Sequence, residues 1–159
     1  MHKILHTRHK RKIAYMHYKG KSEIGFLFFP GFNSDMMGSK ALKIYNWCKT
    51  KKYQCTLFDY SGHGKSSKKF IDSSITEWIE DSNEVLNKVT SAPQILIGSS
   101  MGGWIAIKIG LLNPKKTKGI ITIAAAPDFT KRLWKNDLNH NQKEEIIKNG
   151  FTILPSEYD

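Results

Sequence analysis

The sequence predicts an α/β fold in which a mostly parallel sheet carries helices on both faces. Short apolar segments of strand length alternate with segments whose apolar residues recur at helical spacing. The segment at residues 24–29 is continuously apolar, which is typical of a strand buried on both sides. The 159 residues, 40% of them hydrophobic, suffice for a single domain with one core.

The first half of the chain is expected to hold three strands and two helices. The strands are expected at residues 13–18, at the edge of the sheet, at residues 24–29 and at residues 53–58. Ser39 is a plausible N-cap for the first helix. Ser74 and Glu77 form a capping-box pattern that opens the second helix.

The second half continues the alternation. A strand is expected at residues 94–97, a helix at 101–112, a strand at 119–125 and a polar helical stretch at 128–150. Residues 151–159 show no clear period. The order strand, helix, strand predicts parallel pairing in this half.

The charge of the chain suggests nucleic-acid binding, but its distribution argues against it. The formal net charge is +11, yet only three of the 25 basic residues are Arg and the lysines are scattered. Arg is the usual reader of bases and phosphates, and a nucleic-acid surface concentrates its positive charge. A solvated basic surface is the favoured interpretation, and no nucleic-acid partner is predicted.

Targeting and redox features predict a cytoplasmic protein. No stretch of 18 apolar residues occurs, so no membrane span is predicted, and the basic N-terminus lacks the apolar run of a secretory signal. Cys48 and Cys55 form no C-x-x-C pair and are expected to be reduced structural thiols. Four histidines have no metal-ligand spacing and are expected to lie in a solvated basic arm: His2, His6, His9 and His17.

One motif in the sequence predicts a catalytic nucleophile. Gly98, Ser100 and Gly102 fit G-x-S-x-G between an expected strand and an expected helix. A nucleophile at so sharp a turn adopts strained backbone angles, and the residues two positions before and after it must lack bulk. Ser100, and not Ser99, is therefore the candidate nucleophile.

Two backbone N–H groups are expected to stabilise an oxyanion near Ser100. The helix that begins beside Ser100 directs its positive end at the reacting centre, with the Met101 N–H as the first donor. The loop Pro30-Gly31-Phe32 follows an earlier strand and should supply the second donor, the Phe32 N–H. Alone, the first motif could be a tight glycine turn and the second an ordinary strand exit, but together, in this order and on these elements, they favour the enzyme-type fold.

Three segments of the chain resemble α/β-hydrolases, most closely the mitochondrial acyl-protein thioesterase and acyl-glucuronide esterase group: residues 30–32, 59–66 and 98–104. The resemblance runs from about residue 12 to residue 158. It implies that Ser100 accepts the acyl group, that Phe32 and Met101 form the oxyanion hole, and that esters or thioesters of carboxylic acids are the substrates. It implies no metal and no organic cofactor. It also implies that residues 128–159 begin a cap over the acyl pocket.

A serine nucleophile needs a histidine base and an acid that orients it, and in this fold they follow the serine in the order acid, histidine. The resemblance places both beyond two further strands that this chain does not encode. The chain, residues 1–159, is therefore expected to be a single N-terminal part of an α/β-hydrolase domain with the C-terminal strands missing.

Three residues are weaker candidates for the missing roles. Asp128 follows the last expected strand at the carboxyl end of the sheet, although a helix N-cap is the simpler interpretation. His63 lies in a glycine-punctuated loop, where packing within the loop is the simpler role. His140 lies in a polar helical stretch. The identity of the acid and the base stays open at this point.

The missing strands would leave the uncharged residues 119–126 on a sheet edge, which invites pairing. A second polypeptide that supplies the C-terminal half, self-association through this edge, and a fragment of a decayed gene are the alternatives. Two functional hypotheses follow: a serine esterase or thioesterase, and a non-catalytic remnant or half of a split hydrolase.

Overall fold

The computed structural model describes residues 1–154, which fall into two compact units. The first unit comprises residues 1–126 and the second begins at Pro127. None of the described helices is long and apolar enough to cross a membrane.

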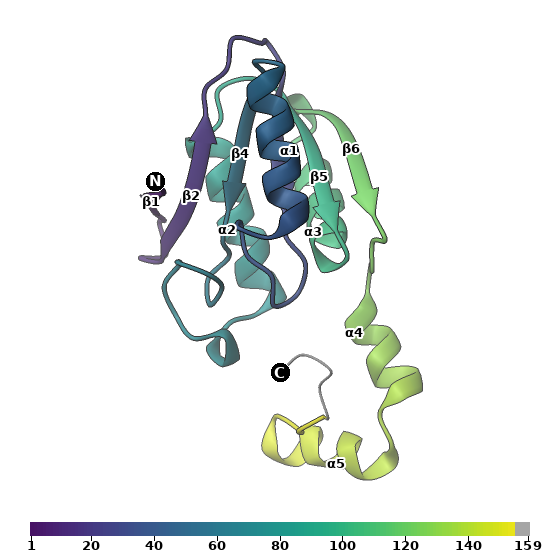
Figure 1. The fold of residues 1–159 in the computed structure, drawn as a ribbon. Helices are drawn as coiled ribbons and strands as arrows, with labels where there is room; N and C mark the ends of the chain where they lie inside the picture. The colour runs from purple at the N-terminus through teal and green to yellow at the C-terminus, as the bar shows by residue number, and fades with distance from the viewer. Residues whose placement is uncertain (155–159) are drawn as a thin grey trace. The chain divides into compact units, whose positions relative to one another are not determined.

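The first unit is built on a sheet that, within the described residues, has six strands in the order β1-β2-β4-β3-β5-β6 (Figure 1). The strands are β1 (Lys3–His6), β2 (Lys12–Tyr18), β3 (Gly25–Phe29), β4 (Gln54–Phe58), β5 (Gln94–Ser99) and β6 (Thr117–Ile123). The β4, β3, β5 and β6 strands are parallel, whereas β1 and β2 are antiparallel to their neighbours. This arrangement confirms the predicted mostly parallel sheet.

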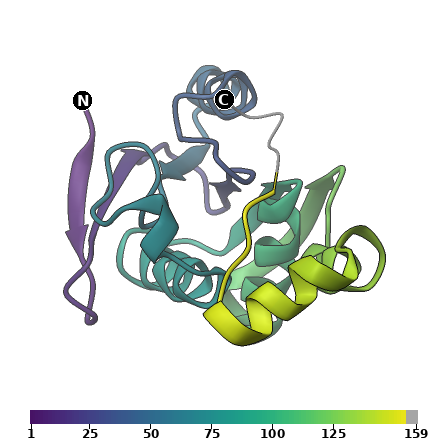
Figure 2. The same cartoon turned by 90° about the horizontal axis from the view of Figure 1, so that it is seen from below.

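Helices cover both faces of the sheet, as predicted. The helix α1 (Ser39–Thr50) lies on one face, and α2 (Ile75–Lys88) and α3 (Met101–Leu112) lie on the other (Figures 1 and 2). Two short 3-10 turns, Phe70–Asp72 and Pro114–Lys116, precede α2 and β6. Both faces are therefore protected from water, which explains why β3 is apolar without alternation and why every residue of β4 is buried.

The predicted N-terminal cap of α2 is confirmed, whereas that of α1 is wrong. Ser74 and Glu77 form the predicted capping box at the start of α2. Gly38, and not Ser39, occupies the N-cap position of α1, and no side chain caps that helix. The first N–H groups of α1 are consequently not satisfied by a capping side chain.

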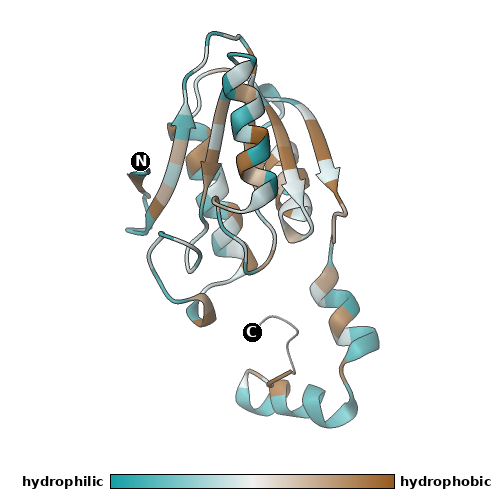
Figure 3. Ribbon diagram, in the orientation of Figure 1, coloured by the Kyte–Doolittle hydropathy of each residue, from teal (hydrophilic) through white to brown (hydrophobic). Residues whose placement is uncertain are grey.

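The core lies on and around the central strands, where every residue of β3 and β4 is buried. Figure 3 shows hydrophobic segments along the strands of the sheet, whereas the ribbon of α1 carries both polar and hydrophobic segments. Burial of each large apolar side chain stabilises the fold by roughly 1.5–3 kcal/mol. The central strands are therefore a rigid support for the loops at their carboxyl ends.

The N-terminal segment is more ordered than predicted. Residues 3–6 form β1, so the strand expected at the edge is instead the second strand, paired on both sides. The expectation that all four N-terminal histidines lie in a solvated arm is wrong for His17, whose Nδ1 lies 2.8 Å from Thr56 Oγ1 on β4. The reason is the pairing of β2 with β4, which sets His17 directly opposite Thr56.

A buried ion pair joins this hairpin to α2. The Arg11 Nε donates to Asp81 at 2.7 Å, and one guanidinium nitrogen also lies 2.9 Å from Glu80. The other carboxylate oxygen of Asp81 accepts from the Ser61 N–H at 2.9 Å. Arg11 thereby helps to hold the loop after β4 in place.

The opposite edge of the sheet is β6, as the sequence predicts for this segment. β6 pairs with β5, and no strand among the described residues pairs with its outer side. The side chains of Ile120 and Ile121 are 41% and 48% exposed. The strand ends earlier than expected because Ala124 takes a left-handed conformation with φ 46°.

The second unit, described up to residue 154, is helical. It contains α4 (Phe129–Arg132), a π-helical turn (Leu133–Asp137) and α5 (His140–Asn149). Asn139 and Gln142 form a capping box at the start of α5, and Gly150 ends the helix with φ 85°. Residues 155–159, which include the end of the predicted cap and of the resemblance, lie outside the described part of the chain.

Candidate active site

Ser100 occupies the turn between β5 and α3 in a conformation that side-chain-bearing residues rarely adopt. Its backbone angles are φ 53° and ψ −121°, and the residue is exposed. Its N–H donates to the Ile123 carbonyl at 2.9 Å, and its carbonyl accepts from the Ala126 N–H at 3.2 Å. The end of β6 thus holds the backbone of the turn.

Glycines make this turn possible by removing bulk. A Cβ atom on Gly98 would lie 2.2 Å from the Gly102 carbonyl oxygen, and one on Gly102 would lie 2.1 Å from the Phe29 carbonyl oxygen. Both distances are far below van der Waals contact. The two glycines of G-x-S-x-G therefore allow β5, α3 and the end of β3 to pack closely together, as predicted.

The loop after β3 reaches Ser100, so the two sequence motifs meet. A Cβ atom on Gly31 would lie 3.6 Å from Ser100 Cβ and 3.4 Å from the Ser99 carbonyl oxygen. Met101 is buried as the first residue of α3, where N–H groups lack intrahelical acceptors. Phe32 is 41% exposed on the same loop as Gly31.

Asp59 fastens this loop to the next one. The buried carboxylate at the end of β4 accepts from the Met36 N–H at 2.7 Å and from the Lys65 N–H at 2.8 Å. Burial raises the pKa of Asp59, and the two N–H donors oppose that shift by favouring the charged form. A Cβ atom on Gly64 would lie 2.2 Å from an Asp59 oxygen, so the glycine gives the carboxylate its space.

Phe32 belongs to an aromatic cluster whose other members are Tyr60, His63, Phe70 and Trp78. The His63 ring centroid lies 4.9 Å from that of Trp78 and 5.1 Å from that of Phe70, which in turn lies 4.9 Å from Phe32. Edge-to-face contacts of this kind stabilise by about 0.5–1.5 kcal/mol each beyond area burial. The cluster supports the loop that carries Phe32.

His63 is a packed residue of this cluster. Its Nδ1 lies 3.2 Å from the Ser61 carbonyl, and burial lowers its pKa, so the ring is neutral at pH 7. Its Nε2 is buried and has no hydrogen-bond partner among the described residues. These contacts support the loop-packing interpretation of His63 over a role as a base.

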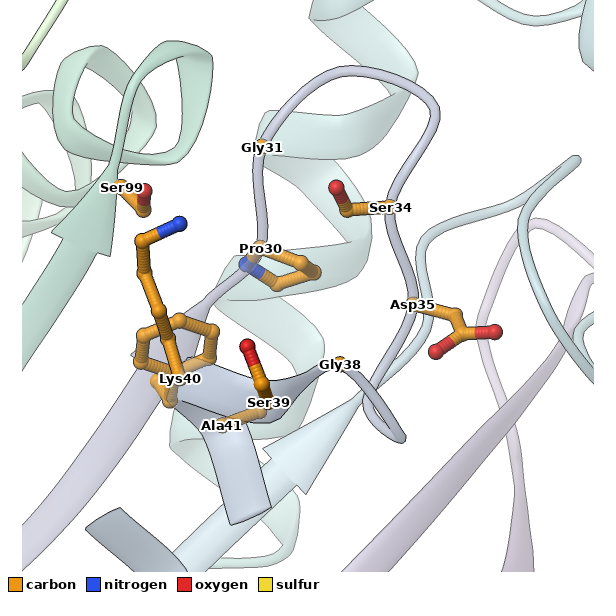
Figure 4. A pocket seen from close by; sticks show the side chains of 10 residues that line it. Pro30, Gly31, Ser34, Asp35, Gly38, Ser39, Lys40, Ala41 and Ser99 are labelled. Carbon is orange, nitrogen blue, oxygen red and sulfur yellow. The ribbon is translucent and has the colours of Figure 1, made fainter. Parts of the chain in front are cut away.

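A pocket of about 150 Å³ adjoins the turn between β5 and α3, next to Ser99 (Figure 4). Its walls come from the loop after β3, the start of α1 and the end of β5. The lining residues are Phe28, Pro30, Gly31, Ser34, Asp35, Gly38, Ser39, Lys40, Ala41 and Ser99. Figure 4 shows the Lys40 ammonium beside the Ser99 hydroxyl.

The remaining candidates belong to the second unit. Asp128 takes the N-cap position of α4 with φ 53°, but its side chain makes no capping hydrogen bond. His140 begins α5, and its exposed ring lies 3.3 Å from Glu144. Neither residue has a contact that assigns it a catalytic role, and both stay candidates from sequence alone.

The described residues contain no group of three or more His, Cys, Asp or Glu side chains that could hold a metal ion. Cys48 on α1 and Cys55 on β4 are buried and free. A hydrogen bond between the two thiols lowers the pKa of Cys48, and the same contact raises the pKa of Cys55. They pack in the core between helix and sheet, as structural thiols do.

Asp59 and Lys40 lie in or beside the loop after β3, and the sequence alone assigned neither of them a role. Asp59 is an acidic residue directly after an apolar strand, and the glycines that follow it signalled a tight loop around it. Lys40 carries no such signal, because it is an exposed lysine in the first turn of a helix, as many lysines are. Its place in a pocket depends on the path of the loop from β3.

Comparisons with known proteins agree with this architecture. Residues 25–144 match the family described as Serine aminopeptidase, S33. The chain is 37% identical over 146 residues to the mitochondrial palmitoyl-protein thioesterase ABHD10 of Homo sapiens, a match that covers 92% of this chain and 47% of the relative. It is 30% identical over 142 residues to the pimeloyl-acyl-carrier protein methyl ester esterase of Wigglesworthia glossinidia brevipalpis, covering 87% of this chain and 48% of the relative.

Solved structures show the same fold. Alpha/beta hydrolase domain-containing protein 10 from mouse superposes with a TM-score of 0.89 at 33% identity, covering 99% of this chain and 62% of that one. An esterase from Exiguobacterium antarcticum gives a TM-score of 0.66 at 26% identity, covering 79% and 46%. The chain thus spans about half the length of the curated relatives that it matches, which agrees with the predicted partial domain.

The comparisons also correct one expectation. The predicted cytoplasmic location is contradicted, because the palmitoyl-protein thioesterases that match 92% of this chain are mitochondrial proteins by name. The lack of an apolar secretory signal does not distinguish the two locations, because mitochondrial targeting segments are basic and need no apolar run. The named relatives are thioesterases and esterases, as the resemblance implied. With residues 25–144 matched, the chain belongs to the Serine aminopeptidase, S33 family of α/β-hydrolases, close to the mitochondrial thioesterase group.

Proposed function

We propose that this chain carries the nucleophile and oxyanion hole of a serine esterase or thioesterase. The observation that carries the proposal is the conformation of Ser100, an exposed serine at φ 53° between two glycines that the packing requires. Backbone strain of about 1–3 kcal/mol persists only where the surrounding structure holds it, and such residues concentrate at active sites. The named relatives supply the reaction class.

The proposed reaction begins with attack of Ser100 Oγ on the carbonyl carbon of an acyl ester or thioester. The carbonyl oxygen becomes an oxyanion that accepts hydrogen bonds from the Met101 and Phe32 N–H groups. Collapse of this intermediate breaks the bond to the alcohol or thiol, which leaves with a proton, and the acyl group stays on Ser100. Water then attacks the acyl-serine, releases the carboxylic acid and restores the hydroxyl.

The base that accepts the Ser100 proton is proposed to come from polypeptide that joins the sheet at the outer side of β6. This edge is open among the described residues, is uncharged over residues 119–126, and is hydrogen-bonded to Ser100 through the Ile123 carbonyl. A parallel strand added here would bring its carboxyl end beside that of β6, at the edge of the sheet where Ser100 lies and where an acid and a histidine are needed. The alternative is that a second copy of this chain pairs with the outer side of β6. This self-association would appear as a dimer in sedimentation.

Residues 127–154 are proposed to begin the cap of the acyl pocket. Trp134 is exposed in this unit, together with other apolar side chains suited to an acyl chain. Under this proposal Trp134→Ala changes the preference among acyl chain lengths without changing the reactivity of Ser100 towards a small phosphonate. An unchanged length preference would argue against the cap assignment.

A serine-directed fluorophosphonate tests the nucleophile. We expect the probe to label the chain at Ser100, to fail with Ser100→Ala, and to react fully with the matched control Ser99→Ala. Peptide mass spectrometry locates the adduct. Absence of labelling in a chain that circular dichroism shows to be folded would remove the catalytic proposal.

A non-catalytic chain is the second candidate, favoured by the neutral, packed state of His63 in the first unit. Loss of the triad base lowers turnover by about 10⁴- to 10⁶-fold. Turnover of a simple thioester therefore separates the two: a triad-level rate in the purified chain excludes the non-catalytic alternative, and stoichiometric acylation without turnover supports a half-enzyme.

A further inference from the structure

The pocket beside Ser100 has a chemistry that the reaction above does not use. We propose that it is a subsite for a carboxylate or phosphate group of the substrate, with Lys40 as the specificity-determining residue. The inference rests on the proposed esterase function for its role, but not for the binding itself. The pocket reaches the nucleophile through Gly31 and Ser99, which line it and flank Ser100.

The size of the pocket suits a small group. Pockets for drug-sized ligands have volumes of roughly 300–1,000 Å³, so a pocket of about 150 Å³ is too small for a whole acyl chain. Because Gly31 lies against the Cβ of Ser100, a group in the pocket would be only a few bonds from the reacting carbonyl. The pocket can therefore recognise a substituent near the bond that breaks.

The lining is polar and positively charged on the side that faces β5. Lys40 is an exposed residue whose ammonium has no ion-pair partner among the described residues, and Figure 4 shows this ammonium beside the Ser99 hydroxyl. The hydroxyls of Ser34 and Ser39 add two further hydrogen-bond donors. An ammonium with hydroxyl donors around one small cavity is suited to an oxyanion.

The start of α1 adds to this positive character. The first turn of α1 forms one wall of the pocket, holds no acidic residue and is not capped by a side chain. Backbone N–H groups at such a helix start favour an anion. Lys40 therefore acts together with, and not in place of, the helix end.

Asp35 is the acidic residue of the lining, and its geometry limits its effect. Its Oδ1 accepts from the Met37 N–H at 2.8 Å. In Figure 4 its carboxylate points away from the Lys40 ammonium, on the opposite side of the loop. Asp35 weakens the positive potential of the pocket but does not neutralise Lys40.

Binding of inorganic phosphate to the full chain tests the site without any need for catalysis. Phosphate is titrated at low ionic strength, where charge interactions are least screened, and amide shifts are followed by NMR. We expect shifts at Gly31, Ser39 and Ser99, and a loss of affinity of about fivefold to tenfold in Lys40→Gln. Lys43→Gln is the matched control, an exposed lysine of α1 outside the pocket, and it should bind within twofold of the unchanged chain.

Two pairs of activated esters then locate the charged group within the substrate. Para-carboxyphenyl acetate against para-carbamoylphenyl acetate places the charge on the leaving group, and para-nitrophenyl hydrogen adipate against para-nitrophenyl adipamate places it on the acyl chain. The rate of Ser100 acylation is measured in a single turnover. We expect Lys40→Gln to slow the charged member of one pair about fivefold to tenfold and to leave the neutral members within twofold.

The outcomes separate the two proposals. Phosphate affinity that is equal in Lys40→Gln and Lys43→Gln, or shifts spread over surface lysines, would overturn the subsite while leaving Ser100 acylation intact. Lys40-dependent phosphate binding with no acylation of Ser100 by any ester would overturn the proposed function and the substrate role of the pocket. Acylation of all four esters without Lys40 dependence would also overturn the specificity role.

Discussion

The Ser100 N–H donates a 2.9 Å hydrogen bond to the carbonyl of Ile123, the last residue of β6. The strained turn is thereby held by the strand at the open edge of the sheet. The Ala126 N–H closes the arrangement from the other direction by donating to the Ser100 carbonyl. Any interaction that orders or loosens β6 is consequently transmitted to the backbone of the candidate nucleophile.

The strain at Ser100 predicts that glycine and alanine have different effects there. At φ 53° and ψ −121°, glycine avoids the Cβ clash, whereas alanine keeps it. We expect Ser100→Gly to be more stable than Ser100→Ala by about 1 kcal/mol, although glycine also gains entropy in the unfolded chain. Urea unfolding of the two variants measures the difference, and equal stabilities would show that the turn is unstrained.

The glycines around Ser100 predict a position-specific loss of stability. Gly98→Ala forces a Cβ to within 2.2 Å of a backbone oxygen, and we expect it to cost more than about 3 kcal/mol or to prevent folding. Gly119→Ala is the matched control, because nothing lies within 4 Å of a Cβ there. It should change the free energy of unfolding by less than about 0.5 kcal/mol. Similar effects of both substitutions on thermal unfolding would contradict the packing described for the turn.

The role of Asp59 predicts a joint loss of stability and reactivity. Asp59→Asn turns an amide N–H₂ towards the Met36 or Lys65 N–H, and leaving a buried donor unsatisfied costs about 1–3 kcal/mol. Because the Met36 loop also carries Phe32, we expect slower fluorophosphonate labelling of Ser100 as well. The exposed Asp72→Asn is the control and should leave both measurements unchanged. If Asp59→Asn is destabilised but is labelled at the normal rate, Asp59 does not position the loop that carries Phe32.

Burial of His63 predicts a pH dependence of stability. The pKa of His63 is lowered from 6.5, mainly by burial, and the pKa of His17 is shifted in the same direction. Below pH 6.5 the unfolded chain therefore binds more protons than the folded one, and this contribution to stability is lost as the pH falls from 6.5 through the lowered folded pKa. It is fully present above pH 6.5.

His63→Phe removes this titration while keeping a ring in the aromatic cluster. We expect the fall in the free energy of unfolding between pH 7 and pH 5 to become smaller in His63→Phe, with the remainder due in part to His17. His2→Gln, at an exposed position, should leave the fall as it is in the unchanged chain. Chemical denaturation at the two pH values provides the comparison, and an unaltered fall in His63→Phe would show that His63 does not contribute.

Local signals in the sequence were sufficient to predict most of the elements that carry the site. A continuous apolar run located β3, and the Ser74–Glu77 capping box located the start of α2 to the residue. The sequence also identified Ser100, since the glycine requirement of a strand-to-helix turn involves neighbours two residues away. These features depend on sterics and hydrogen bonds within one or two turns of chain, which a pattern of residue types records directly.

Only the tertiary structure decided the features that join distant segments. β1 forms because β2 offers it a free edge, and Asp59 reaches Met36 across 23 positions because parallel strands end side by side. Lys40 lines a pocket because the loop after β3 folds back against Ser99. The sequence by itself determined which residue occupies the strained turn between β5 and α3, and so which residue is the candidate nucleophile. Its surroundings were decided by long-range packing, whose partners leave no local pattern in the chain.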